Sequence, residues 1–147
     1  MMNIDVLGPS DIVGMIEMDQ IADFLYEHLD QYGDEKEDIK KAIDYALNKG
    51  ITPGGYIIRG REGSEIVGAV VVNRTGMQGY IPENILVYIA VNSECRGKGY
   101  GKLLMQKAID TAEGNIALHV EPDNPAKILY EKLGFTNKYL EMRLSKS

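Results

Sequence analysis

The chain has little of three things: cysteine, long apolar runs and positive charge. Its single cysteine, Cys95, cannot form an internal disulfide, and no Cys/His cluster predicts a zinc site. No run of about 18 apolar residues predicts a membrane span. The first residues lack the basic and apolar regions of a secretory signal. We therefore expect a cytoplasmic protein without a structural metal and without a membrane partner.

Basic residues are also scarce. Lys and Arg number 16 against 22 Asp and Glu, which gives a net charge of −6. This balance argues against general nucleic-acid binding, which needs a basic face. It is compatible with a cationic small-molecule partner, although many proteins are acidic only to remain soluble. The length of 147 residues predicts one domain, covering residues 1–147.

Hydrophobic periodicity predicts a mixed α/β protein. The helix at residues 35–48, for example, places Ile39, Ile43 and Leu47 on one face. The nearly apolar run Ile85–Val91 is typical of a central strand covered on both faces. The expected order is β-α-α-β-β-β-α-β-α-β. The strands are expected at Asn3–Leu7, Tyr56–Arg59, Ile66–Asn73, Ile85–Val91, Ile116–Val120 and Lys138–Leu144, and the helices at about 11–29, 35–48, 99–112 and 124–133. Gly60–Gly63 is expected to be a hairpin turn.

A glycine-rich segment lies between the central strand and the next helix. Its glycines, Gly97, Gly99 and Gly101, let backbone N–H groups point into a common concavity, and a helix N-terminus adds a positive dipole end. The basic side chains of Arg96, Lys98 and Lys102 add full charges. The spacing fits neither the P-loop nor the dinucleotide fingerprint. An ordinary tight turn is the alternative to a phosphate site.

Two segments resemble a known family. Arg96-Gly97-Lys98-Gly99-Tyr100-Gly101 after Ile89-Ala90-Val91 resembles the R/Q-x-x-G-x-G/A signature of the GCN5-related N-acetyltransferases (GNAT). The later block Asn124–Phe135, which contains Leu129-Tyr130-Glu131-Lys132-Leu133-Gly134-Phe135, resembles that family's "LYEKLGF" motif. The resemblance covers nearly the whole chain. It implies a sheet whose fourth and fifth strands splay apart to form a cleft for acetyl-CoA, used as a co-substrate without a metal.

The resemblance also implies binding residues. The pyrophosphate of coenzyme A would lie on the amides of Gly97 to Lys102, and the pantetheine arm on the backbone of Ile89, Ala90 and Val91. The coenzyme-binding set is then Ile89, Ala90, Val91, Arg96, Gly97, Lys98, Gly99, Tyr100, Gly101, Lys102, Asn124 and Tyr130. In the usual N-x-x-A-x-x-L-Y two residues separate Asn and Ala, but here only Pro125 separates Asn124 from Ala126. Either Asp123 takes the family asparagine position, or Asn124 takes it in a loop that is one residue shorter.

Acetyl transfer from a thioester to an amine needs a base, an oxyanion donor and an acid. Tyr130 matches the family's general acid, and the N–H of Ile89 or a neighbour matches the oxyanion donor. For the base, His119 occupies the position of a glutamate in ribosomal-protein acetylases. Glu83 and a water chain are the alternatives. Cys95 is interpreted as structural, since the family transfers acetyl directly.

The acceptor side is less well defined. An acidic run (Glu27, Asp30, Asp34, Glu35, Glu37 and Asp38) surrounds the junction of the first two helices. It could attract a cationic amine, or it could only cap a solvated helix. The sequence therefore predicts an N-acetyltransferase for a small primary amine, and the resemblance allows a homodimer. A protein N-terminus or lysine as acceptor, and a non-catalytic acyl-CoA-binding module, remain as alternatives.

Overall fold

The computed structural model describes residues 1–48 and 50–146. A five-stranded sheet forms its centre, in the order β1-β2-β3-β4-β5. The strands are β1 (Asn3–Leu7), β2 (Gly55–Glu62), β3 (Glu65–Arg74), β4 (Asn84–Val91) and β5 (Ile116–Leu118). The first four pair in antiparallel fashion, and β5 alone pairs in parallel, with β4. This is the predicted mixed α/β class.

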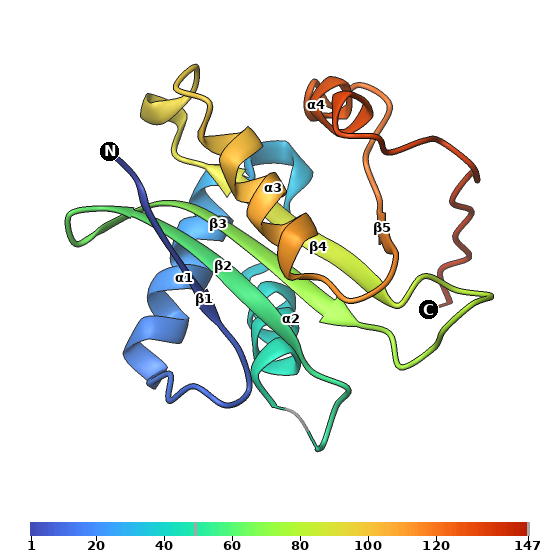
Figure 1. Cartoon of the computed structure of the whole chain (residues 1–147), viewed down its shortest axis with the longest axis horizontal. Coiled ribbons are helices and arrows are strands. Elements are labelled where there is room, and N and C mark those ends of the chain that lie inside the picture. Colours follow the sequence, from blue (N-terminus) through green and yellow to red (C-terminus); the bar gives the residue numbers. More distant parts are fainter. Residues whose placement is uncertain (49, 147) are drawn as a thin grey trace.

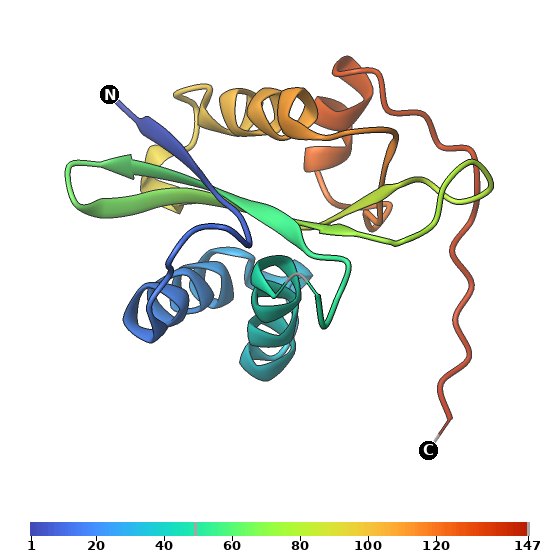
Figure 2. The same ribbon diagram turned by 60° about the horizontal axis from the view of Figure 1, so that its bottom comes forward.

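Helices cover both faces of the sheet (Figures 1 and 2). The helices α1 (Met15–His28) and α2 (Lys36–Leu47) lie on one face, and α3 (Tyr100–Thr111) lies on the other. The short helix α4 (Ala126–Lys132) follows β5. Two short 3-10 turns, η1 (Asp30–Tyr32) and η2 (Ser93–Cys95), precede α2 and α3. None of the helices in the described ranges is both long enough and apolar enough to cross a bilayer.

Each face of the sheet has its own hydrophobic core. Under α3, the side chains of Leu104, Met105 and Ala108 pack on Val70 and Val72. Under α1 and α2, another cluster gathers Ile21, Leu25, Ile39, Ile43, Ile57, Val71 and Tyr88. The alternation of strand residues between these clusters buries β2 and β3 on both faces, whereas in β4 buried residues alternate with partly buried ones.

The hairpin turn lies later than predicted. The turn is Gly63-Ser64, and Gly60 belongs to β2, where it pairs with Gly68 of β3. A Cβ on Gly60 would meet Met2 Sδ at 2.4 Å, and one on Gly68 would meet Leu104 Cδ1 at 2.4 Å. The absence of side chains at these two positions therefore lets α3 and the N-terminal segment approach the sheet. Gly60 therefore serves close packing, and the prediction that it begins the hairpin turn is wrong.

The predicted strand at Lys138–Leu144 is wrong. Residues 133–146 form no strand, and the side chains of Tyr139, Leu140, Met142 and Leu144 are at least 78% exposed. After α4 the chain runs away from the sheet and does not pair with β5 (Figures 1 and 2). The alternating pattern was present, but a strand also needs a partner that takes up its backbone hydrogen bonds. For the same reason β5 ends at Leu118 and not at Val120.

Candidate active site between strands β4 and β5

The strands β4 and β5 separate soon after they begin. Their parallel pairing covers only Asn84↔Ile116, Ile85↔Ala117 and Leu86↔Leu118, whereas β4 continues to Val91. On its other edge β4 pairs with β3 along its whole length, with a register shift that leaves Val87 as an extra residue. Such a bulge bends its strand. We call residues 87–91 of β4 and 119–124 after β5 the fork.

The fork leaves backbone groups free on one edge of β4. From Val87 to Val91, the N–H and C=O groups that face β5 have no strand partner in the described ranges. The nearby side chains of Ile89, Val91, Val120 and Leu129 are apolar and partly buried. An extended amide-containing chain with an apolar end could therefore add to this edge. This is where a pantetheine arm was predicted, at Ile89, Ala90 and Val91.

The glycine loop follows β4 after the short turn η2. Gly97 and Gly99 have φ values of +89° and +81°, which side chains rarely tolerate. Gly99 is the N-cap of α3, and it provides no side-chain cap. The amides of Tyr100, Gly101 and Lys102, in the first turn of α3, have no intrahelical acceptor. The loop thus offers free N–H donors at the positive end of a helix dipole, which suits a phosphate group.

Two of the basic side chains, Arg96 and Lys98, pair with carboxylates. Arg96 lies 3.2 Å from Asp30, and Lys98 lies 3.7 Å from Glu62. Glu62, at the end of β2, also accepts a hydrogen bond from the Tyr100 hydroxyl. This bond is the main cause that lowers the pKa of Glu62, and it raises the pKa of Tyr100 to about 12. Sequence reasoning missed Glu62, because it lies 38 positions before Tyr100.

Tyr130 of α4 is buried beside the fork. Its side chain is 7% exposed and makes an edge contact with Phe135, with ring centroids 6.1 Å apart. Burial raises the pKa of Tyr130 to about 12, and the hydroxyl makes no hydrogen bond to another described residue. The phenol therefore stays protonated at neutral pH and is free to donate to a ligand.

The two candidate bases lie in different places. His119 is the first residue after β5, is exposed, and belongs to the fork. Glu83 precedes β4, at the end where β4 and β5 are still paired. Its carboxylate accepts hydrogen bonds from the amides of Asn115 (2.7 Å) and Gly79 (3.0 Å), and these bonds lower its pKa. Of the two, His119 is the one that lies in the fork, whereas the contacts of Glu83 join the segments before β4 and β5.

Asn124 and Asp123 lie in the turn before α4. The Oδ1 of Asn124 accepts a hydrogen bond from the Ala126 amide at 2.9 Å, so this oxygen already caps the helix. The exposed Asp123 offers its backbone carbonyl to the Tyr32 hydroxyl at 3.3 Å. Asn124 thus keeps only its side-chain N–H₂ for a ligand.

The α1–α2 junction, residues 28–35, crosses the end of the fork. Its contacts reach three separate segments. Tyr88 of β4 donates a 2.6 Å hydrogen bond to Asp34, Arg96 pairs with Asp30, and Tyr32 bonds to Asp123. The Ser93 amide also lies 3.4 Å from His28 Nδ1. The structure therefore brings Asp30 and Asp34 of the acidic run to the predicted site.

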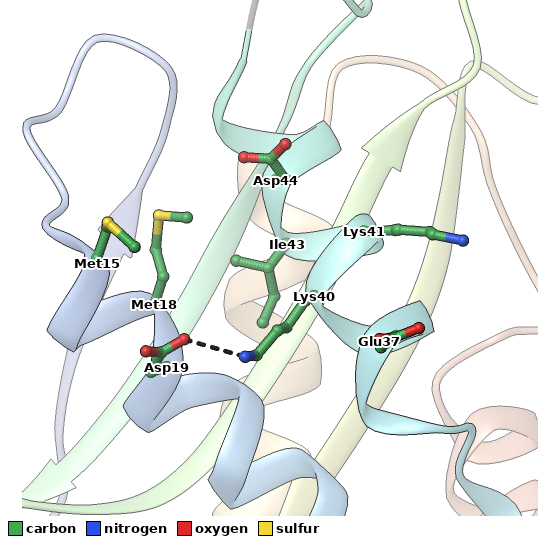
Figure 3. Close-up of a pocket in the computed structure, with 8 residues that line it drawn as sticks. All are labelled: Met15, Met18, Asp19, Glu37, Lys40, Lys41, Ile43 and Asp44. Atoms are coloured by element: carbon green, nitrogen blue, oxygen red, sulfur yellow. Dashed lines mark ion pairs between the residues drawn. The ribbon is translucent and has the colours of Figure 1, made fainter.

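A groove of about 430 Å³ lies elsewhere on the molecule. It is lined by residues of α1 and α2, among them Met15, Met18 and Asp19, with an ion pair of 3.4 Å between Lys40 and Asp19 (Figure 3). None of the fork residues 87–91 and 119–124 lines this groove. Cys95 is buried, with 7% of its side chain exposed, and its Sγ lies 3.9 Å from a carboxylate oxygen of Glu62. This burial argues against a role as a nucleophile.

Comparisons with known proteins agree with this geometry. Residues 19–135 match the model of the acetyltransferase (GNAT) family. The chain belongs to the GNAT family. Its members are acetyl-CoA-dependent N-acetyltransferases, and so is this protein. The free amides of the glycine loop and the open edge of β4 fit that co-substrate.

Solved structures share the fold. A GNAT-family acetyltransferase from Streptococcus pneumoniae TIGR4 superimposes with a TM-score of 0.71 at 18% identity, covering 99% of this chain and 98% of that one. A ribosomal-protein-alanine N-acetyltransferase from Brucella melitensis biovar Abortus 2308 gives 0.68 at 17%, with 99% and 100% covered. The aminoglycoside N-acetyltransferase AAC(6')-Iy, in complex with CoA, gives 0.70 at 14%, with 99% and 95% covered. Identities this low show the fold alone.

Proposed function

We propose that this acetyltransferase transfers the acetyl group of acetyl-CoA directly to the primary amine of a small cationic molecule. The observation that carries the proposal is the position of the α1–α2 junction. It brings the Asp34 carboxylate to Tyr88 of β4, next to the expected acetyl group, and the Asp30 carboxylate to Arg96 at the glycine loop. Carboxylates that line an approach attract cations and raise their local concentration.

The chemistry follows from the residues around the fork. A neutral amine attacks the thioester carbonyl, and a free N–H of β4, at Ile89 or a neighbour, stabilises the oxyanion. As the C–S bond breaks, the Tyr130 hydroxyl protonates the departing thiolate, and the tyrosinate regains a proton from the nitrogen of the new amide, directly or through water. His119, or a water held near it, takes the proton of the incoming ammonium. The burial of Cys95 supports direct transfer without an acyl-enzyme.

A panel of amines tests the acceptor class. Acetyl-CoA is mixed with a polyamine, an aminoglycoside, a basic amino-acid amide and a peptide with an N-terminal alanine, and free CoA thiol is followed. We expect the cationic small molecules to give the highest kcat/KM. Turnover of the peptide alone would overturn the small-molecule assignment in favour of a protein acceptor. Tight CoA binding without any turnover would favour a binding module. A homodimer and a cytoplasmic location stay predictions from the sequence.

A further inference from the structure

Glu62 lies beside the glycine loop without belonging to it. It is the last residue of β2, and its carboxylate meets three residues of the loop region: the Tyr100 hydroxyl, Lys98 Nζ at 3.7 Å and Cys95 Sγ at 3.9 Å. The three residues come from η2, the loop and the start of α3. One carboxylate of the rigid sheet therefore joins all parts of the segment that carries the free amides.

Tyr100 connects Glu62 to the start of α3. It is the first residue of α3, and its ring is buried in the core, with 8% of the side chain exposed. The glycines on either side of it permit many backbone conformations, and α3 has no side-chain cap of its own. The bond from Tyr100 to Glu62 is thus what fixes the start of α3 to β2, together with the burial of the ring.

We propose that Glu62 is a positioning residue for coenzyme A: through Tyr100 it holds the first turn of α3 and the loop amides in the arrangement that receives the pyrophosphate. This inference rests on the proposed use of acetyl-CoA at the loop. Glu62 itself does not touch the coenzyme. The lowered pKa of Glu62 and the raised pKa of Tyr100, both caused mainly by their shared hydrogen bond, keep an anionic acceptor opposite a neutral donor at neutral pH.

The charge of Glu62 works against the same ligand. A carboxylate near a pyrophosphate repels it, and Lys98 offsets this only in part, since both side chains are partly exposed. If repulsion dominated, removing the carboxylate would tighten coenzyme binding. If positioning dominates, removing it weakens binding. The two effects have opposite signs, so one measurement separates them.

The experiment measures CoA affinity by titration calorimetry for the parent, Glu62→Ala, Glu62→Gln, Tyr100→Phe and the double variant Glu62→Ala/Tyr100→Phe. We expect Glu62→Ala to weaken binding about tenfold, as the loss of a charge-assisted hydrogen bond implies. Glu62→Gln keeps an oxygen that accepts from Tyr100 and should lose less. Tyr100→Phe leaves the carboxylate without its partner and should lose most. The double variant should bind no more weakly than Tyr100→Phe.

A second substrate separates positioning from general stability. S-acetylpantetheine carries the thioester without the pyrophosphate, so Glu62→Ala should lower kcat/KM for acetyl-CoA and leave kcat/KM for S-acetylpantetheine unchanged. An equal loss with both substrates would overturn the proposal, as would parent-like or tighter CoA binding by Glu62→Ala, or additive losses in the double variant. Failure of the parent itself to bind CoA would instead refute the proposed function.

Discussion

The coenzyme side and the acceptor side of the fork are built differently. The coenzyme side uses backbone groups of one continuous stretch, residues 87–102, whose conformation depends on two glycines at positive φ. The acceptor side uses the α1–α2 junction, whose side chains Asp30, Tyr32 and Asp34 meet Arg96, the backbone carbonyl of Asp123 and Tyr88, all far away in sequence. A backbone site leaves a local spacing pattern in the sequence, whereas a side-chain site does not. This difference explains why the co-substrate could be inferred and the acceptor could not.

The largest effect is expected where the two sides meet, at Tyr130. Tyr130→Phe keeps the buried ring and its contact with Phe135 but removes the hydroxyl that we propose protonates the thiolate. We expect kcat to fall by about 10²–10⁴, with little change in CoA affinity. Because burial raises the pKa of Tyr130 to about 12, the acid form persists well above pH 9. A loss of parent activity between pH 8 and 10 would therefore come from another group.

Tyr26→Phe is the matched control for this variant. Tyr26 lies on α1 with 53% of its side chain exposed, so loss of its hydroxyl should leave kcat unchanged. Parent-like turnover by Tyr130→Phe would show that the acid is a different residue.

The next largest effect belongs to the coenzyme side. Gly99→Val places a β-branched side chain at φ +81°, and the backbone must shift to relieve the strain. We expect CoA affinity to fall by more than about tenfold, because the loop amides move with it. Gly79→Val is the control: Gly79 has φ +79° and equally open surroundings, but lies outside the loop. Equal CoA affinity in both folded variants would contradict the phosphate role of the loop.

Much of the fold and of the coenzyme side could be predicted from the sequence, and the predictions that failed share one cause. The helices and the central strands followed from periodicity, and the glycine loop from its spacing. The prediction failed at Gly60, which serves close packing, and at 138–144, where no partner strand is present. It also missed Glu62 and Tyr88. Each case depends on what lies opposite a residue in space, which a local pattern does not contain.

His119→Ala should have a smaller effect, and one that depends on pH. A base matters most where the amine is mostly protonated, so kcat/KM should fall about tenfold near pH 7 and recover as the pH approaches the pKa of the acceptor. The acidic limb of the kcat/KM profile should move with the substitution. An unmoved limb would show that His119 is not the base and would favour a water chain.

Glu83→Gln separates the other candidate base from a structural role. The two backbone hydrogen bonds lower the pKa of Glu83 below its ordinary 4.5, so the folded state favours the anion. Its contribution to stability is full above about pH 4.5 and is lost as the pH falls through the lowered pKa. We expect a small decrease in Tm at pH 7 that disappears in acid, with kcat unchanged. A large loss of kcat at unchanged Tm would instead make Glu83 catalytic.

The smallest effect is expected on the acceptor side. Neutralising Asp34, Glu35 and Asp38 together should raise KM for a cationic amine about threefold at low salt and less at high salt, because exposed charges are screened. CoA affinity should not change. The control is Asp19→Asn/Asp44→Asn/Asp110→Asn, which removes the same charge at positions outside the acidic run, two of them lining the groove of Figure 3. Equal KM changes in both triple variants would show that the net negative charge of the protein attracts the amine, and not the particular carboxylates of the acceptor side. A change in Tm alone would assign these carboxylates to the N-terminus of α2.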